Sequence, residues 1–153
     1  MNSKEIQCPV DFVQMNENKA RLTAFWVFAL GIIFLLTNWW IIMAFLVIDF
    51  LLRANSLGKY SLLAILSGVI INLFKIKNKP VDRAPKRFAA GVGLVFATGI
   101  LILTLLKLDT AVLIVTAVLL LFAFLESIVG FCAGCYVYNG LLRIGNSFKN
   151  NQL

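Results

Sequence analysis

Three cysteines are the residues of this sequence whose type and spacing point most directly to chemistry. Cys132 and Cys135 form a CxxC pair, and Cys8 lies near the N-terminus. Two thiols at the CxxC spacing can form a disulfide, hold a soft metal ion or pass sulfur from one to the other. Cysteine is also a small apolar residue that packs well in protein interiors, so a purely structural role for the pair stays open.

The residues around the cysteines support both interpretations. The pattern predicts a short surface helix over residues 10–19, with Pro9 at its first position and Cys8 at its N-cap, where the helix dipole favours a thiolate. Gly130 and Gly134 form a GxxxG motif, which by itself explains close helix packing. The cysteines are therefore either reactive thiols gathered at one face of the protein or parts of a packing motif.

Glu126 is an acidic residue within an apolar stretch, and a carboxylate inside a membrane usually faces the interior of the helix bundle or a partner. It could take up or release a proton for a nearby thiol. In one unbroken helix it points away from Cys132, six positions later, so direct contact requires a break near Gly130. The alternative is an architectural ion pair with one of three arginines, Arg21, Arg53 or Arg87.

Other charged residues could support such a site. Asp49 and Arg53 have the i, i+4 spacing of a helical ion pair, and Arg21 or Arg53 could favour a thiolate. Lys86 and Arg87 could bind a headgroup phosphate or an anionic substrate. The catalytic candidates are therefore Cys8, Cys132, Cys135 and Glu126. The supporting candidates are Arg21, Asp49, Arg53, Lys86 and Arg87.

The composition indicates a membrane protein. Of the 153 residues, 61% are hydrophobic and 14% are charged, whereas a soluble domain has about 45–50% apolar and about 25% charged residues. A chain this short has too small an interior to hide such a surplus of apolar surface. The net charge of +7 lies in short segments between apolar runs, which favours membrane topology and anionic lipid headgroups over nucleic acid. The absence of histidine removes the commonest general base.

The apolar runs predict an all-α integral membrane protein with about four transmembrane helices in two hairpins, plus an interfacial helix. The expected spans cover about residues 20–37, 39–53, 88–106 and 110–131. The interfacial helix covers about residues 60–74, and a cytoplasmic loop covers residues 75–87. A polar turn at Asn38, beside Trp39 and Trp40, suits a hairpin at the membrane interface.

The distribution of positive charge predicts the orientation. If the stretch 60–74 lies flat on the membrane, nearly all lysines and arginines share one compartment, and the opposite side holds little beyond Lys107 and Asp109. Positive charge accumulates in cytoplasmic loops, so we expect a multi-pass inner-membrane protein with both termini in the cytoplasm. If 60–74 spans the membrane instead, the basic cluster after it falls on the other side.

Short motifs occur in order along most of the chain: Cys8-Pro9-Val10-Asp11, Asn18 with Arg21, Asp49 with Arg53, Ala84-Pro85-Lys86-Arg87-Phe88-Ala89, Leu125-Glu126, and Gly130-Phe131-Cys132-Ala133-Gly134-Cys135. This ordered set resembles an uncharacterised family of small bacterial membrane proteins, a domain of unknown function. The resemblance implies a bacterial four-helix membrane protein with a thioredoxin-like or sulfur-transfer partner. It brings no established activity, and the cofactor stays unknown.

Three functional hypotheses follow from these patterns. The first is a cytoplasmic-face site for thiol redox or sulfur-species handling, in which Cys132 and Cys135 exchange and Cys8 resolves or receives. The second is a copper or zinc binding or transport subunit, because three thiolates suit these soft metals. The third is a non-catalytic membrane scaffold, with homo-oligomerisation through the GxxxG motif. The sequence does not decide whether the protein is an enzyme.

Overall fold

The computed structural model describes residues 14–55, 57–130 and 133–150. This part of the chain forms β1 (Gln14–Asn16), α1 (Glu17–Thr37), α2 (Trp40–Ala54), α3 (Leu62–Leu73), β2 (Pro80–Asp82), α4 (Arg83–Leu105), α5 (Asp109–Val129) and α6 (Ala133–Asn150). Apart from two strands of three residues each, the described elements are helices. The prediction of an all-α protein is therefore confirmed.

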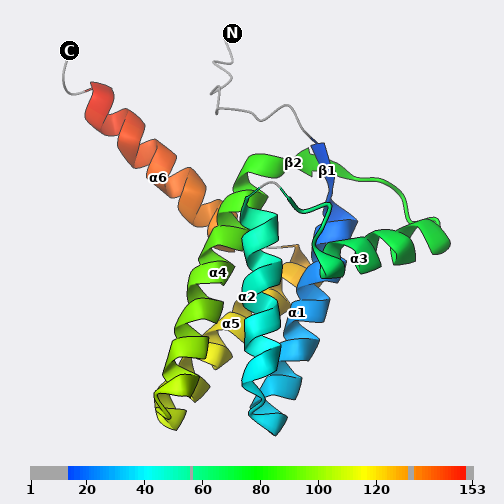
Figure 1. Ribbon diagram of the computed structural model, residues 1–153. Coiled ribbons are helices and arrows are strands. Elements are labelled where there is room, and N and C mark those ends of the chain that lie inside the picture. Colours follow the sequence, from blue (N-terminus) through cyan, green and yellow to red (C-terminus); the bar gives the residue numbers. More distant parts are fainter. Residues whose placement is uncertain (1–13, 56, 131–132, 151–153) are drawn as a thin grey trace, which may run out of the picture.

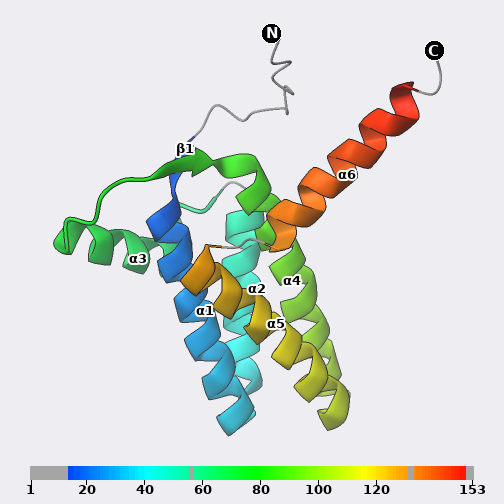
Figure 2. The same ribbon diagram turned by 180° about the vertical axis from the view of Figure 1, so that it is seen from behind.

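Four helices, α1, α2, α4 and α5, lie side by side in a bundle (Figures 1 and 2). The helix α2 packs chiefly on α4, and α1 packs chiefly on α5. The helix α3 packs on α1 and extends sideways from the bundle, and α6 contacts α4 before extending beyond the bundle (Figures 1 and 2).

Two short turns reverse the chain at the same end of the bundle (Figure 1). Asn38 ends α1 in the left-handed conformation, with φ 55°, and its N–H donates to the carbonyl of Phe34. Lys107 takes a similar conformation, with φ 56°, between α4 and α5. Asparagine tolerates this conformation well, which explains why a polar residue follows the first apolar run. We call the other end, where α1 and α4 begin, the charged end.

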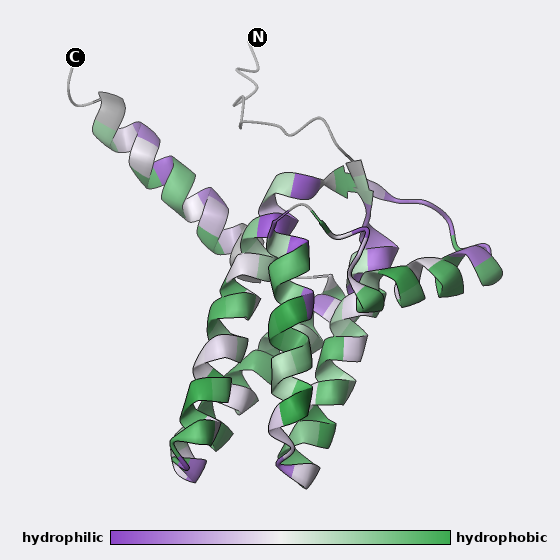
Figure 3. Ribbon diagram, viewed as in Figure 1, coloured by the Kyte–Doolittle hydropathy of each residue, from purple (hydrophilic) through white to green (hydrophobic). Residues whose placement is uncertain are grey.

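Three helices, α1, α4 and α5, are long and apolar enough to cross a membrane. They indicate that the chain is a membrane protein. The helix α2 is also apolar but has 15 residues, fewer than the ~20 of a straight span. Figure 3 shows hydrophobic residues along the bundle, with hydrophilic residues gathered at the charged end.

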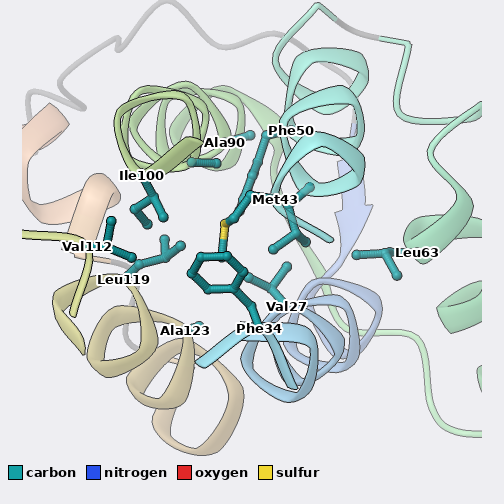
Figure 4. Close-up of a cluster of buried hydrophobic side chains, with 12 residues drawn as sticks. Val27, Phe34, Met43, Phe50, Leu63, Ala90, Ile100, Val112, Leu119 and Ala123 are labelled. Atoms are coloured by element: carbon teal, nitrogen blue, oxygen red, sulfur yellow. The ribbon is translucent and has the colours of Figure 1, made fainter. Parts of the chain in front are cut away.

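Large side chains from several helices fill the centre of the bundle. Phe34, Met43 and Ile100 have no exposed surface and meet in one cluster (Figure 4). A Cβ atom added at Gly93 would lie 2.5 Å from Cε1 of Phe50, so only glycine lets α4 approach the Phe50 ring this closely. The helix α2 is held against α4 by the burial of this cluster and by the close fit of Gly93 to the Phe50 ring.

The start of the described chain is tied to the segment before α4. The strands β1 and β2 are antiparallel, with Gln14 opposite Asp82 and Asn16 opposite Pro80. The predicted surface helix over residues 10–19 is therefore wrong for residues 14–16, which are extended. The segment 75–87, expected as a loop, contains β2 and the first residues of α4. Asn16 also explains the start of α1, because its side chain accepts a hydrogen bond from the N–H of Asn18.

Candidate functional site: the charged end of the bundle

Arg21 connects the start of α1 to the end of α5. Its guanidinium donates two hydrogen bonds to Glu17, at 2.8 and 3.1 Å, and one to the carbonyl of Val129 at 3.4 Å. A Cβ atom added at Gly130 would clash with this guanidinium. Lys79 holds the other oxygen of Glu17 at 2.9 Å. Arg21 therefore lies against the backbone two residues before the CxxC motif.

Gly130 ends α5 in the left-handed conformation, with φ 69°, and α6 begins at Ala133. The helix is therefore broken at the point where contact between Glu126 and Cys132 requires a break. Cys135 falls in the first turn of α6 by its position in the sequence. Cys8 and Cys132 lie outside the described residues, and so does the side chain of Cys135. The predicted gathering of three thiols stays a prediction.

Glu126 forms an ion pair with Lys86 on α4, with 3.6 Å between Oε1 and Nζ. Both side chains are mostly buried, since Glu126 is 18% exposed and Lys86 is 12% exposed. An ion pair with an arginine is one of the two roles that the sequence offers for this carboxylate, whereas its partner among the described residues is this lysine. The ion pair links α4 to α5 at the charged end.

Asp49 joins α2 to the start of α3. Its Oδ1 accepts a hydrogen bond from the hydroxyl of Ser61 at 2.5 Å and a longer one from the N–H of Leu63 at 3.4 Å. The Ser61 hydroxyl also caps α3 by accepting from the N–H of Ala64. The predicted pair with Arg53 is present but long, at 3.9 Å from the other oxygen. The geometry makes Asp49 mainly an anchor for α3.

A second contact positions α3 against the bundle. The hydroxyls of Thr23 on α1 and Ser67 on α3 form a buried hydrogen bond of 3.0 Å. Ser61, Thr23 and Ser67 are not among the candidate residues from the sequence. Their signal is a hydroxyl at a helix N-cap or on the buried face of an apolar helix, which is common and weak.

Five cations line a pocket of roughly 260 Å³ at the charged end, which we call the basic pocket: Arg53, Lys59, Arg83, Lys86 and Arg87. Three of them, Arg53, Lys86 and Arg87, are candidate site residues from the sequence. Arg87 also donates from Nε to the carbonyl of Ala54 at the end of α2, at 3.2 Å. Lys59 and Arg83 are not among those candidates, although they contribute to the positive charge from which the orientation is predicted.

A smaller pocket of roughly 130 Å³ lies within the bundle, and we call it the apolar pocket. Its described lining is apolar, including Phe50, Gly93 and Phe96, except for Arg53 and Glu126. The two pockets share Arg53 and Ala90. The Arg53 side chain, 14% exposed, therefore borders both an apolar cavity and a strongly basic one.

Residues 15–143 match the family described as a domain of unknown function, DUF4395. The chain belongs to this family. The match covers every helix of the bundle, and it confirms the resemblance to an uncharacterised family. No curated protein and no solved structure matches this DUF4395 chain.

Within the described part of this DUF4395 chain, no group of three or more Cys, Asp or Glu residues could hold a metal ion. Two of the three cysteines lie outside that part, so the copper or zinc hypothesis stays untested. The charged end of this DUF4395 chain thus holds one guanidinium beside the CxxC segment, one mostly buried ion pair and one basic pocket.

Proposed function

We propose that this DUF4395 chain is a multi-pass protein of the bacterial inner membrane that handles thiols or sulfur species at the cytoplasmic end of its bundle. The observation that carries this proposal is the contact between Arg21 and the backbone of Gly130. A cation close to cysteine favours the thiolate, which is the nucleophilic form. The first turn of α6 supplies a second favourable field, because a helix N-terminus attracts negative charge.

The proposed topology has four transmembrane helices in two hairpins. The helices α1, α4 and α5 meet the length of a span, and α2 lies between α1 and α4 as the fourth. The distribution of charge supports this arrangement. At the far end the charged residues of the turns are Lys107 and Asp109, whereas most basic residues lie at the charged end. By the positive-inside rule, the charged end is cytoplasmic.

In this topology α3 lies in the membrane interface. It extends sideways from α1 near the charged end (Figure 1), with Leu63 and Ile71 on its buried face. Its other faces expose large apolar side chains: Leu62, Ile65, Leu66, Val69 and Leu73. An apolar surface of this kind needs lipid or protein to cover it, and a helix lying flat can place it among acyl chains.

The proposed chemistry is thiol–disulfide exchange between the CxxC pair and a partner disulfide. One thiolate attacks the disulfide, a mixed disulfide forms, and one partner sulfur leaves and takes up a proton. The second cysteine then attacks the mixed disulfide, so the CxxC disulfide forms and the partner leaves as a dithiol carrying two electrons. A dithiol of a thioredoxin-like protein restores the pair by the reverse steps. We assign the transfer of these protons to Glu126. Cys8 is the alternative resolving thiol: if it attacks the mixed disulfide in place of the second CxxC cysteine, the new disulfide joins Cys8 to the attacking cysteine and the partner again leaves as a dithiol.

The test is alkylation of the thiols by a membrane-impermeant maleimide in inverted and right-side-out vesicles. We expect the thiols to react in inverted vesicles only. At pH 7 we expect the alkylation rate of the Arg21→Gln variant to be about two- to fivefold lower than that of the wild type. Arg143→Gln is the matched control, because Arg143 is an exposed cation on the same helix as Cys135. Labelling in right-side-out vesicles would contradict the topology. Equal rates in Arg21→Gln and the wild type would contradict the role of Arg21.

The soft-metal alternative has its own measurement. Stoichiometric copper or zinc in the protein purified with reduced thiols would replace the exchange proposal with a metal site, and its absence would favour exchange. If the Cys132→Ser, Cys135→Ser double variant complemented a deletion strain, both the exchange proposal and the metal-site alternative would be excluded. The non-catalytic scaffold would then be the remaining hypothesis.

A further inference from the structure

The basic pocket brings together cations from separate segments of the chain. Arg53 lies in the last turn of α2, Lys59 lies in the link to α3, and Arg83, Lys86 and Arg87 lie in the first two turns of α4. None of the described residues that line this pocket is acidic. A cavity that is lined by five cations is electrostatically suited to an anion.

The start of α4 adds to this positive field. Arg83, Lys86 and Arg87 occupy the end of a helix where the dipole is already positive and where acidic residues are normally favoured. The first turn of this 23-residue helix contains no acidic residue, and Asp82 directly precedes it. An anion in the basic pocket would face both the basic side chains and the positive end of the helix dipole.

Two carboxylates near the pocket form ion pairs with two of its cations. Asp49 lies 3.9 Å from Arg53, but its other oxygen already accepts hydrogen bonds from Ser61 and Leu63. Glu126 lies 3.6 Å from Lys86 and lines the apolar pocket. Arg53 and Lys86 are largely buried, so water screens their charge less than it would at an open surface.

The chemistry of the cations identifies the class of anion. Arginine presents a planar set of N–H donors that matches phosphate oxygens in pairs, and lysine supplies a compact positive charge to the same group. A pocket of roughly 260 Å³ with arginines and lysines on several sides has the donors that a phosphate group needs.

The apolar pocket indicates what the phosphate is attached to. It shares Arg53 and Ala90 with the basic pocket, and Phe50, Gly93 and Phe96 line it. An anionic headgroup joined to an apolar chain would match both pockets at once. We propose that the basic pocket binds the phosphate of an anionic membrane lipid, with Arg53 at the boundary between headgroup and chain.

Native mass spectrometry of the full chain in detergent can measure this binding. The probes are phosphatidic acid, phosphatidylcholine with the same acyl chains, and inorganic phosphate as a competitor. The expected result is retention of phosphatidic acid at least tenfold above phosphatidylcholine, with no displacement by millimolar inorganic phosphate. Displacement by inorganic phosphate would overturn the lipid assignment and identify a site for free phosphate.

The paired variant is Lys59→Gln with Arg83→Gln, which removes two of the five pocket cations. Each cation near an anionic headgroup contributes about fivefold to its binding, so the pair should lower retention of phosphatidic acid by roughly tenfold to thirtyfold. The control pair is Lys107→Gln with Arg143→Gln, neither of which lines the pocket. Equal losses in both pairs, or equal binding of both lipids by the wild type, would overturn the proposal.

Lys59→Gln alone provides a milder variant, because Lys59 is exposed and its loss leaves the helix contacts in place. It should lower retention of phosphatidic acid by about fivefold. Unchanged retention would overturn the proposal even if the paired variant misfolded. The Cys132→Ser, Cys135→Ser variant should bind phosphatidic acid as the wild type does, which separates this site from the proposed thiol chemistry.

Discussion

Lys86 on α4 and Glu126 on α5 form an ion pair that lies between two pockets of different character. The lysine lines the basic pocket, the carboxylate lines the apolar pocket, and 3.6 Å separates Nζ from Oε1. Both side chains are largely buried, and a buried charge without a partner is unfavourable. Each residue therefore stabilises the charge of the other. The pair therefore holds α4 against α5, and it also changes the charge that each pocket presents.

Removing one partner of this pair should destabilise the bundle. We expect Glu126→Gln to lower the free energy of unfolding by about 1 to 3 kcal/mol, because Lys86 then lies largely buried without its counter-charge. Thermal unfolding of the purified protein in detergent measures the change. The exposed cation Arg143 offers the control, and Arg143→Gln should change stability by less than about 0.5 kcal/mol.

The double variant Lys86→Gln with Glu126→Gln tests whether the two residues act together. It should be less destabilised than the sum of the single variants, by about 0.5 to 3 kcal/mol, since no lone charge is left behind. Additive losses would show that the ion pair contributes nothing beyond its two separate side chains.

The second prediction concerns the anchor of α3. Asp49→Ala removes the acceptor for Ser61 and Leu63, so it should cost about 1 to 3 kcal/mol and speed amide exchange in the first turn of α3. Asp49→Asn keeps an acceptor oxygen and should cost less. Thr37→Ala is the control, because the exposed Thr37 hydroxyl bonds only within its own helix. If Asp49→Asn were as damaging as Asp49→Ala, the ion pair with Arg53 would be the important contact instead.

Features set by composition and local pattern could be predicted from the sequence. Apolar runs predict the helices, and the segregation of charge predicts one strongly basic end. The break at Gly130 follows the rule that glycine favours the left-handed conformation at a helix end. The position of Asn38 between two apolar runs likewise predicts the turn that the structure has there.

Contacts between distant segments could not be predicted in this way. Asn16 lies opposite Pro80, and no local pattern indicates that such short strands pair. The partner of Glu126 depends on how α4 is rotated against α5, which packing decides, so Lys86 rather than an arginine lies opposite it. The helix α6 is not among the predicted elements either, because its apolar residues are interspersed with polar ones and form no continuous apolar run.

The third prediction concerns Gly130, where backbone conformation and the arginine contact meet. Gly130→Ala places a methyl group at a φ of 69° and against the guanidinium of Arg21, so two separate penalties apply. The left-handed conformation alone costs about 1 to 2 kcal/mol for a residue with a side chain. We expect a loss of stability of at least that size, measured by thermal unfolding.

The same substitution should also slow alkylation of the CxxC thiols, because the new methyl group displaces Arg21 from the end of α5. Gly140→Ala is the matched control: Gly140 lies within α6, and a Cβ atom there would meet nothing within 4 Å. In a helix interior this change should stabilise the protein by about 0.5 to 1 kcal/mol and leave alkylation unchanged. A Gly130→Ala protein with wild-type stability would contradict the contact with Arg21. Equal alkylation rates in the two alanine variants would separate that contact from thiol reactivity, and the charged end would then have to activate its thiols without Arg21.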